Sequence, residues 1–126
     1  MDFNDGYNTY IAQKGASLSG GQKQRMSIAL ALVRKPEILI LDDATSALDL
    51  ATEAKLRKAL KEELSSTTVI MIAQRIASVK DADRIAVIEN GTINDIGTHD
   101  ELMASSATYR DIYSSQMKES GGEANE

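Results

Sequence analysis

Several residue types are scarce or missing from this chain of 126 residues, and each absence narrows what the protein can be. There is no cysteine, which excludes disulfides and is compatible with a reducing compartment such as the cytoplasm. Tryptophan is absent and phenylalanine occurs once, so few aromatic side chains can contribute to a core. The single histidine cannot form the ligand cluster that a zinc site requires. The length suits one domain or part of one, with modest stability in isolation.

Long hydrophobic runs and an excess of basic residues are missing as well. Apolar runs such as Val69–Ala73 fall far short of the ~20 residues needed to cross a bilayer. The first residues include acids and have no apolar core, so no signal peptide is expected. A net charge of −5 argues against a general nucleic-acid binder, which would need a basic face. Any membrane role must therefore come through a partner or a missing segment.

Two segments that are present point to nucleotide chemistry. Residues 18–22 read LSGGQ, a glycine-containing turn that opens a helix, where backbone N–H groups can approach a phosphate closely. Residues 39–43 read LILDD, an apolar strand with two carboxylates at its carboxyl end, where open α/β sheets place their ligands. No Gly-Lys pair occurs, so the phosphate-binding loop G-x-x-x-x-G-K-[ST] is absent. The chain alone therefore cannot form a complete ATP site.

The apolar patterns predict an α/β fold with a largely parallel sheet, flanking helices and a C-terminal β-hairpin. The predicted strand at 38–41 is an uninterrupted apolar run, which indicates burial on both faces. The strand at 67–73 is rich in β-branched residues and is also expected to be buried. Asn90-Gly91 supplies the two positive-φ residues of a type I′ hairpin turn, and capping-box spacings open helices at Ser19 and at Thr98. Strands are expected at 38–41, 67–73, 84–89 and 92–96. Helices are expected at 22–34, 50–64 and 108–117, with a short helical turn at 76–79 and a further helix from 98.

Five segments carry a resemblance to a known family: LSGGQ at 18–22, LILDD at 39–43, ATSALD at 44–49, IAQR at 72–75 and GTHDEL at 97–102. They resemble the nucleotide-binding domain of exporter-type ATP-binding-cassette (ABC) transporters, in which LSGGQ is the signature motif and the strand with its acids is the Walker B motif. The resemblance extends from about Gly6 to Met117. It implies a partial P-loop NTPase (ABC ATPase) domain, with residues 1–117 forming its C-terminal portion and residues 118–126 a disordered tail.

The resemblance also implies roles for particular residues. In the family the signature motif completes the ATP site of the opposite domain, closing over the γ-phosphate in a head-to-tail dimer, with ATP and Mg²⁺ as cofactors. Asp42 would hold Mg²⁺ through water, since this ion dehydrates reluctantly. Ser46 and Asp49 would belong to the segment called the D-loop. The signature motif is complete in this chain, with Leu18, Ser19, Gly20, Gly21 and Gln22.

Two residues depart from the family pattern at the catalytic positions. Asp43 stands where catalytic members carry glutamate, and it is one methylene shorter, so its reach to the attacking water is reduced. Gln74 stands where members have a histidine that touches the γ-phosphate, and an amide cannot carry positive charge towards it. His99, the only histidine, lies after the hairpin and is expected to be structural. Together, Asp43 and Gln74 indicate a degenerate hydrolytic site.

The two departures and the intact signature motif predict an asymmetric arrangement. In the family, the Walker B residues and the switch residue, whose position Gln74 occupies here, act on ATP held by their own domain. The signature motif instead acts across the interface on ATP held by the other domain. The resemblance therefore implies a heterodimer in which this subunit has the weak site and completes the competent site of a second nucleotide-binding domain. A transmembrane domain would be the other partner, no nucleic acid is expected, and the location would be the cytoplasmic face of the plasma membrane.

Three other interpretations stay open at this point. The chain could be a non-catalytic, ATP-dependent interaction module that supplies its signature motif to a partner. It could derive from an ABC ATPase that acts on DNA, although such relatives carry long coiled-coil insertions and no sustained heptad pattern occurs here. It could also be the remnant of a truncated gene. The sequence does not separate a split protein, a truncated gene product and an expressed fragment, and it does not identify the transported substrate.

Overall fold

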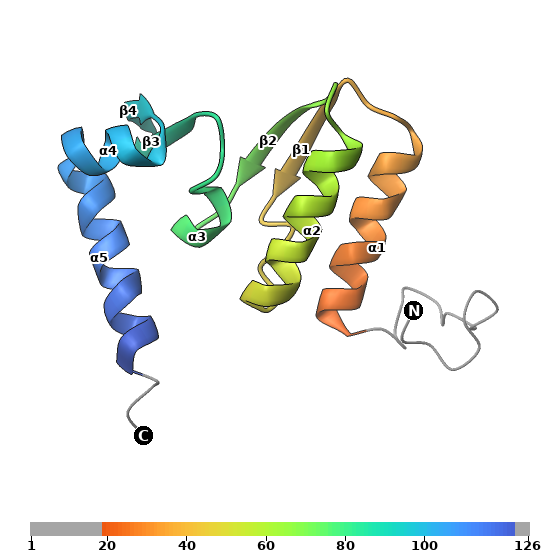
Figure 1. Cartoon of the computed structure of the whole chain (residues 1–126), viewed down its shortest axis with the longest axis horizontal. Helices are drawn as coiled ribbons and strands as arrows, with labels where there is room; N and C mark the ends of the chain where they lie inside the picture. The colour runs from red at the N-terminus through yellow and green to blue at the C-terminus, as the bar shows by residue number, and fades with distance from the viewer. Residues whose placement is uncertain (1–18, 123–126) are drawn as a thin grey trace. The chain divides into compact units, whose positions relative to one another are not determined.

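The computed structural model describes residues 19–122, and Figure 1 labels its helices and strands. The chain divides into two compact units, Met1–Ile70 and Met71–Glu126. In chain order the described elements are α1 (Gly20–Val33), β1 (Ile38–Asp42), α2 (Leu50–Glu63), β2 (Thr68–Ile72), α3 (Ile76–Val79), β3 (Ile85–Glu89), β4 (Thr92–Gly97), α4 (His99–Ser105) and α5 (Ala107–Gly122). None of the helices in this range is long and apolar enough to span a membrane.

Helix α1 begins at a capping box and ends in a left-handed turn. The Ser19 hydroxyl accepts a hydrogen bond from the N–H of Gln22, and the Gln22 side chain accepts one from the N–H of Ser19. At the other end, Lys35 has φ +47° and its N–H donates to the carbonyl of Leu32. Pro36 follows directly and disfavours the right-handed helical conformation at Lys35, so the helix stops here, as the sequence predicts.

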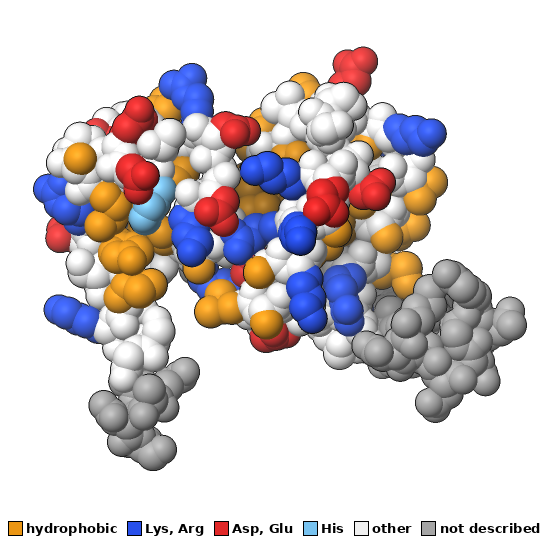
Figure 2. Space-filling model, viewed as in Figure 1, with side chains coloured by type: hydrophobic (Ala, Val, Ile, Leu, Met, Phe, Trp, Pro, Cys, Tyr) orange, Lys and Arg blue, Asp and Glu red, His pale blue; other side chains and the backbone are white. Residues whose placement is uncertain are grey.

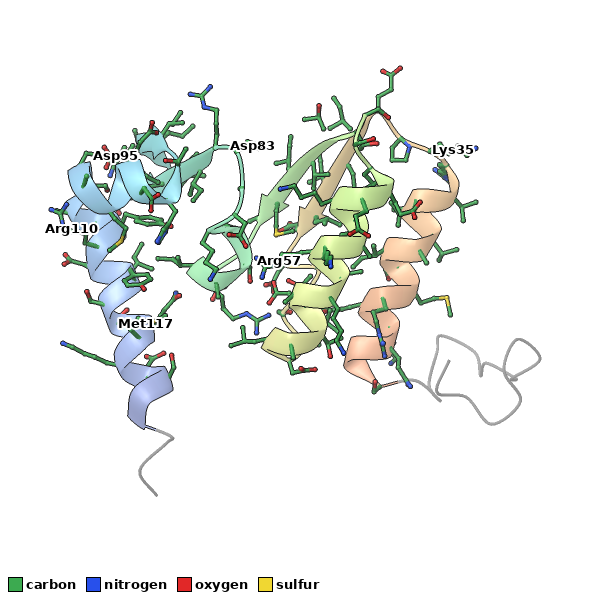
Figure 3. The ribbon with its side chains drawn as sticks, in the orientation of Figure 1. Lys35, Arg57, Asp83, Asp95, Arg110 and Met117 are labelled. Atoms are coloured by element: carbon green, nitrogen blue, oxygen red, sulfur yellow. The ribbon has the colours of Figure 1, made fainter. Side chains whose placement is uncertain are left out.

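Replacing Lys35 by glycine should stabilise the protein. Lysine has a Cβ atom that crowds the following carbonyl in the left-handed region, whereas glycine adopts this conformation freely. After the entropy that glycine gains in the unfolded chain is subtracted, we expect a gain of about 0.5–1 kcal/mol. Urea unfolding of the full chain measures it, with Glu37→Gly as the control at a position without positive φ. Lys35 follows the end of α1 and is labelled in Figure 3. A loss of stability in Lys35→Gly would contradict the left-handed conformation assigned to Lys35.

Strands β1 and β2 pair with each other, and their arrows point the same way in Figure 1, as expected for a strand–helix–strand unit. The expectations that β1 is buried on both faces and that β2 is a buried strand are wrong for the described residues. In β2, Val69, Ile70 and Ile72 are 40%, 48% and 52% exposed. Leu39 and Leu41 are buried, but Ile38 and Ile40 on the other face are 60% and 61% exposed. Burial of a strand's second face requires another packed layer, and no described element covers Ile38 and Ile40.

The second unit contains a β-hairpin and three helices. Strands β3 and β4 are antiparallel, with Ile85 opposite Gly97 and Glu89 opposite Thr92, and a register shift follows Val87. The turn has φ +52° at Asn90 and +75° at Gly91, which agrees with the expected pair of positive-φ residues. The core of the second unit is a cluster of apolar side chains from α3, β3, α4 and α5: Ile76, Ile85, Val87, Leu102 and Tyr109.

Helix α5 continues five residues beyond Met117, the predicted end of the last helix, so residues 118–122 of the expected tail are helical. Two serine hydroxyls bond to carbonyls of the preceding turn, Ser115 to Ile112 and Ser120 to Gln116. Serine hydroxyls inside a helix commonly bond back to a carbonyl of the preceding turn, so these two serines are accommodated within α5. Residues 123–126 lie outside the described range. In the face shown in Figure 2, acidic and basic side chains occur together on each unit.

Candidate functional site

The predicted signature motif forms the start of helix α1. Ser19 is the N-cap, and Gly20 and Gly21 are the first two helical residues, whose N–H groups have no partner within the helix. The Gln22 N–H is already satisfied by the Ser19 hydroxyl, at 3.2 Å. The turn therefore offers two backbone donors at the positive end of a helix of 14 residues, an arrangement suited to a phosphate oxygen. Leu18 lies outside the described residues.

The two glycines also lie close to the segment that follows β1. A Cβ atom at Gly21 would come within 3.1 Å of the Leu48 side chain and 3.3 Å of the Ala47 carbonyl oxygen. At Gly20 it would meet only the Ala47 side chain, at 3.5 Å, which is an ordinary contact. A side chain at Gly21 would therefore force Leu48 and the Ala47 carbonyl to shift, whereas Gly20 has room for a side chain.

The two adjacent carboxylates differ in backbone conformation. Asp42 is the last residue of β1 and is exposed, and Asp43 follows in the left-handed region at φ +49°. Aspartate adopts this region more readily than most side chains. Among the described residues no group of three or more acidic, histidine or cysteine side chains could hold a metal ion. A magnesium ion at Asp42 would therefore depend on water and phosphate for most of its ligands.

The two predicted D-loop residues make local hydrogen bonds, Ser46 to the backbone of Asp43 and Asp49 at the start of α2. The Ser46 hydroxyl donates to the Asp43 carbonyl at 3.2 Å. Asp49 is the N-cap of α2 and accepts from the hydroxyl of Thr52 at 2.5 Å and from its N–H at 3.1 Å. These two bonds, the hydroxyl first, lower the pKa of Asp49 below its ordinary value, so it stays ionised at neutral pH.

A buried carboxylate connects this loop to α2. Glu53 is 1% exposed, and its carboxylate accepts a hydrogen bond from the hydroxyl of Thr45 at 2.8 Å. The sequence pattern gave no sign of this, because an acid in the first turn of a helix is normally solvated and favoured there by the helix dipole. The contact fixes the loop at Thr45 from the side of α2.

Gln74 lies in the second unit, between β2 and α3, with an exposed side chain. Its backbone carbonyl accepts from the side-chain amide of Gln116 at 2.8 Å, and the Gln116 oxygen accepts from the N–H of Ile76 at 2.9 Å. One side chain of α5 therefore holds the backbone on either side of Arg75. Sequence reasoning missed Gln116, which is 42 residues from Gln74 in the chain.

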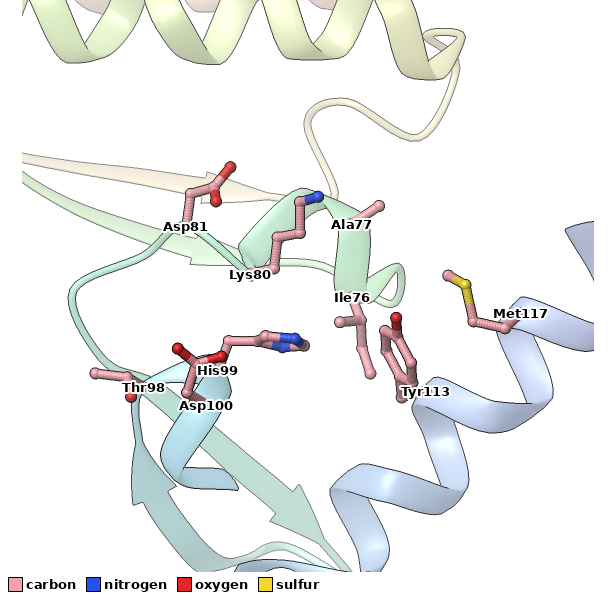
Figure 4. A pocket seen from close by; sticks show the side chains of 9 residues that line it. All are labelled: Ile76, Ala77, Lys80, Asp81, Thr98, His99, Asp100, Tyr113 and Met117. Carbon is pink, nitrogen blue, oxygen red and sulfur yellow. The ribbon is translucent and has the colours of Figure 1, made fainter. Parts of the chain in front are cut away.

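The second unit also contains a pocket of about 420 Å³ near His99, shown in Figure 4. The His99 Nδ1 atom is 2.9 Å from the hydroxyl of Tyr109, and its ring contacts those of Tyr109 and Tyr113, each with 5.7 Å between centroids. Burial raises the pKa of Tyr109 above its ordinary value, so this hydroxyl keeps its proton at neutral pH. None of the predicted site residues lines the pocket, and these contacts fit the structural role expected for His99.

Comparison with known proteins gives a consistent result. A family model described as "ABC transporter" matches residues 1–46. The chain is 50% identical over 120 residues to the uncharacterized ABC transporter ATP-binding protein YfiB of Bacillus subtilis (strain 168), covering 95% of this chain and 21% of that protein. To the putative multidrug export ATP-binding/permease protein YgaD of the same organism it is 46% identical over 116 residues, covering 92% and 20%. It matches the structure of a bacterial Atm1-family ABC exporter with ATP bound with a TM-score of 0.85 and 36% identity, covering 91% of this chain and 20% of that one.

The chain belongs to the ABC transporter family. It is part of the ATP-binding domain of an ABC exporter, and the resemblance and the α/β fold class predicted from the sequence are confirmed. It spans about a fifth of the length of the ABC transporter relatives that it matches. Of the predicted site residues that the structure describes, Ser19 to Gln22, Asp42, Asp43, Ser46 and Asp49 lie in the first unit and Gln74 lies in the second.

Proposed function

We propose that this chain acts within the ATP-hydrolysing domain of an ABC exporter by supplying its signature motif to ATP held by a second nucleotide-binding domain. The observation that carries the proposal is the start of α1, where the backbone N–H groups of Gly20 and Gly21 have no partner within the helix and follow the capping residue Ser19. Such a turn stabilises a γ-phosphate by hydrogen bonds and by the helix dipole. The residues present thus suit ATP, and Asp42 suits a water-held Mg²⁺ ion.

A complete nucleotide-binding domain would also contain a phosphate loop, and its ATP site would include Asp43 and Gln74 of this chain. We propose that ATP hydrolysis at this site is slow. Asp43 is shorter than the glutamate of catalytic relatives, and Gln74 places an uncharged amide where those relatives have a histidine. A well-placed general base is worth ~10²–10⁴ in rate, so a short acid sacrifices much of that factor. We therefore propose a heterodimer in which this subunit binds ATP and hydrolyses it slowly, while its partner hydrolyses ATP rapidly.

The partners follow from this assignment. The second nucleotide-binding domain would provide the phosphate loop opposite α1, and a transmembrane domain at the cytoplasmic face of the plasma membrane would use the resulting movement for export. No nucleic-acid partner is proposed, given the net charge of −5 and the mixed charges seen on each unit.

Isothermal titration calorimetry of the full chain with Mg²⁺ and ATP tests this division of labour. We expect weak binding and no hydrolysis, because most phosphate contacts in this class come from the phosphate loop and its lysine. Adding a complete nucleotide-binding domain that holds ATP should produce ATP-dependent association, and Gly20→Asp should weaken it. Micromolar, Mg²⁺-dependent binding by the chain alone would contradict the proposal, as would association that is indifferent to ATP.

A further inference from the structure

The side chain of Gln24, two residues after the signature motif, connects α1 to the loop that follows β1. Its amide nitrogen donates to the Asp43 carbonyl at 3.3 Å and to the Ser46 hydroxyl at 3.0 Å. Its oxygen accepts from the N–H of Ala47 at 3.0 Å. A single carboxamide thus makes three contacts with a segment 19 to 23 residues away in the chain.

These contacts converge on the backbone at Asp43. The Asp43 carbonyl accepts from the Gln24 amide, from the Ser46 hydroxyl at 3.2 Å and from the Ser46 N–H at 3.4 Å. The same residue has φ +49°, a conformation that persists in a residue other than glycine only where the surroundings fix it. The orientation of the Asp43 peptide is therefore set partly from α1.

The close packing at Gly21 holds the same two segments together. The Ala47 carbonyl and the Leu48 side chain lie too near for a Cβ atom at Gly21 without a shift. Gln24 and Gly21 are three residues apart on α1, so they lie on the same face of the helix. That face carries both the hydrogen bonds and the backbone approach to residues 43–48.

We propose that Gln24 is a positioning residue that makes the signature turn and the Asp43 loop move as one body. This inference rests on the proposed function for its consequence, since it links the site of this subunit to the site of its partner within one chain. A displacement of α1 by the partner's γ-phosphate would be transmitted to Asp43 through the Gln24 carboxamide. Each ATP site of the pair is composite, because one domain supplies the phosphate loop and Walker B motif and the other supplies the signature motif. ATP at one composite site would thereby influence the geometry of the other.

Only a carboxamide at residue 24 can make all three hydrogen bonds. The Asp43 carbonyl and the Ser46 hydroxyl accept from its nitrogen, and the Ala47 N–H donates to its oxygen. Methionine has similar length and helix propensity but makes none of the three hydrogen bonds. Glutamate keeps the oxygen that accepts from Ala47 and loses the N–H group that donates to the Asp43 carbonyl. The two substitutions therefore separate the acceptor side of the contact from the donor side.

Amide hydrogen exchange at Ala47, followed by NMR in the full chain without nucleotide, tests the positioning role directly. Gln24→Met should speed the exchange about tenfold, because the N–H loses its partner and the loop its anchor. Gln24→Glu should keep Ala47 protected within about twofold, since the carboxylate still accepts. Lys23→Met is the matched control at the neighbouring exposed position and should leave Ala47 unchanged.

A second readout tests the coupling. In an assembled pair of complete domains containing these residues, Gln24→Met should lower kcat at both composite sites, with KM for ATP and the Lys23→Met control within about twofold. Unchanged Ala47 exchange in Gln24→Met, or equal acceleration in Gln24→Glu or Lys23→Met, overturns the positioning role whether or not the protein hydrolyses ATP. Faster Ala47 exchange with kcat lowered at one site only overturns the coupling. Because the exchange needs no nucleotide, failure of the proposed function leaves its result interpretable.

Discussion

Placing an aspartate at Gly20 should abolish ATP hydrolysis at the partner's site in an assembled pair of domains. The carboxylate would lie where the γ-phosphate is expected to dock, and the two negative charges would repel each other. We expect a loss of about 100-fold or more, comparable to removing a donor from an oxyanion site. The helix itself should tolerate the change, because Gly20 has room for a side chain and an acid is favourable in the first turn.

Two control variants separate charge from folding. Gly20→Asn has nearly the same shape without the charge, so the difference between Asn and Asp measures the electrostatic effect. Ser19→Ala removes the capping hydroxyl without adding bulk and costs about 0.5–2 kcal/mol of stability, whereas Ser19→Arg also blocks the turn. We expect Ser19→Arg to abolish partner hydrolysis and Ser19→Ala to reduce it only moderately.

The same experiment predicts an order of effects between the two functional segments. Asp43→Asn removes the charge but keeps a residue that tolerates the left-handed conformation, so the loop should stay folded. Because this acid is proposed to belong to the slow site, its loss should change steady-state ATPase activity far less than Gly20→Asp does. A larger loss from Asp43→Asn would place the competent site on this subunit and refute the assignment.

Restoring the longer acid and the histidine should accelerate hydrolysis at this subunit's own site. In a complete domain with the partner's site disabled, Asp43→Glu and Gln74→His together should raise turnover by about 10²-fold or more, the range of a well-placed base. The double variant should exceed the product of the single ones, since both groups act on one water and one phosphate. Turnover is measured at saturating ATP in all four variants.

The left-handed backbone at residue 43 adds a specific expectation to this series. Glutamate tolerates φ +49° less well than aspartate, so Asp43→Glu should lower stability slightly while it raises turnover. Asp43→Gly is the control that keeps the backbone and removes the acid, and it should be inactive at this site. Equal turnover in the original and restored variants would show that the site is not degenerate at these two positions.

The local features of the fold could be predicted from the sequence because they depend on neighbouring residues. The capping boxes at Ser19 and Thr98 and the positive-φ pair at Asn90 and Gly91 all form as expected. Each requires only hydrogen bonds or backbone conformations within about four residues, so composition and spacing suffice. The end of α1 before Pro36 follows for the same reason.

Contacts between distant residues could not be predicted in this way. The buried Glu53 with its Thr45 partner, and the Gln116 bonds around Arg75, depend on which helix packs beside which loop. The error at β1 has the same origin, since its apolar run suits burial on two faces while only one is covered in the described residues. A side chain's own type does not reveal the layer above it.

The sequence by itself determined the family, the α/β class and the start of α1 at the signature turn. It also determined the two departures from the family pattern, the shorter acid Asp43 and the uncharged amide Gln74. These depend on residue type and order alone. Only the tertiary structure decided that Gly21 packs closely against Ala47 and that the Gln24 carboxamide reaches the Asp43 carbonyl. Both result from folding two segments about 20 residues apart against each other, where distances of 3 to 3.5 Å decide which side chains fit.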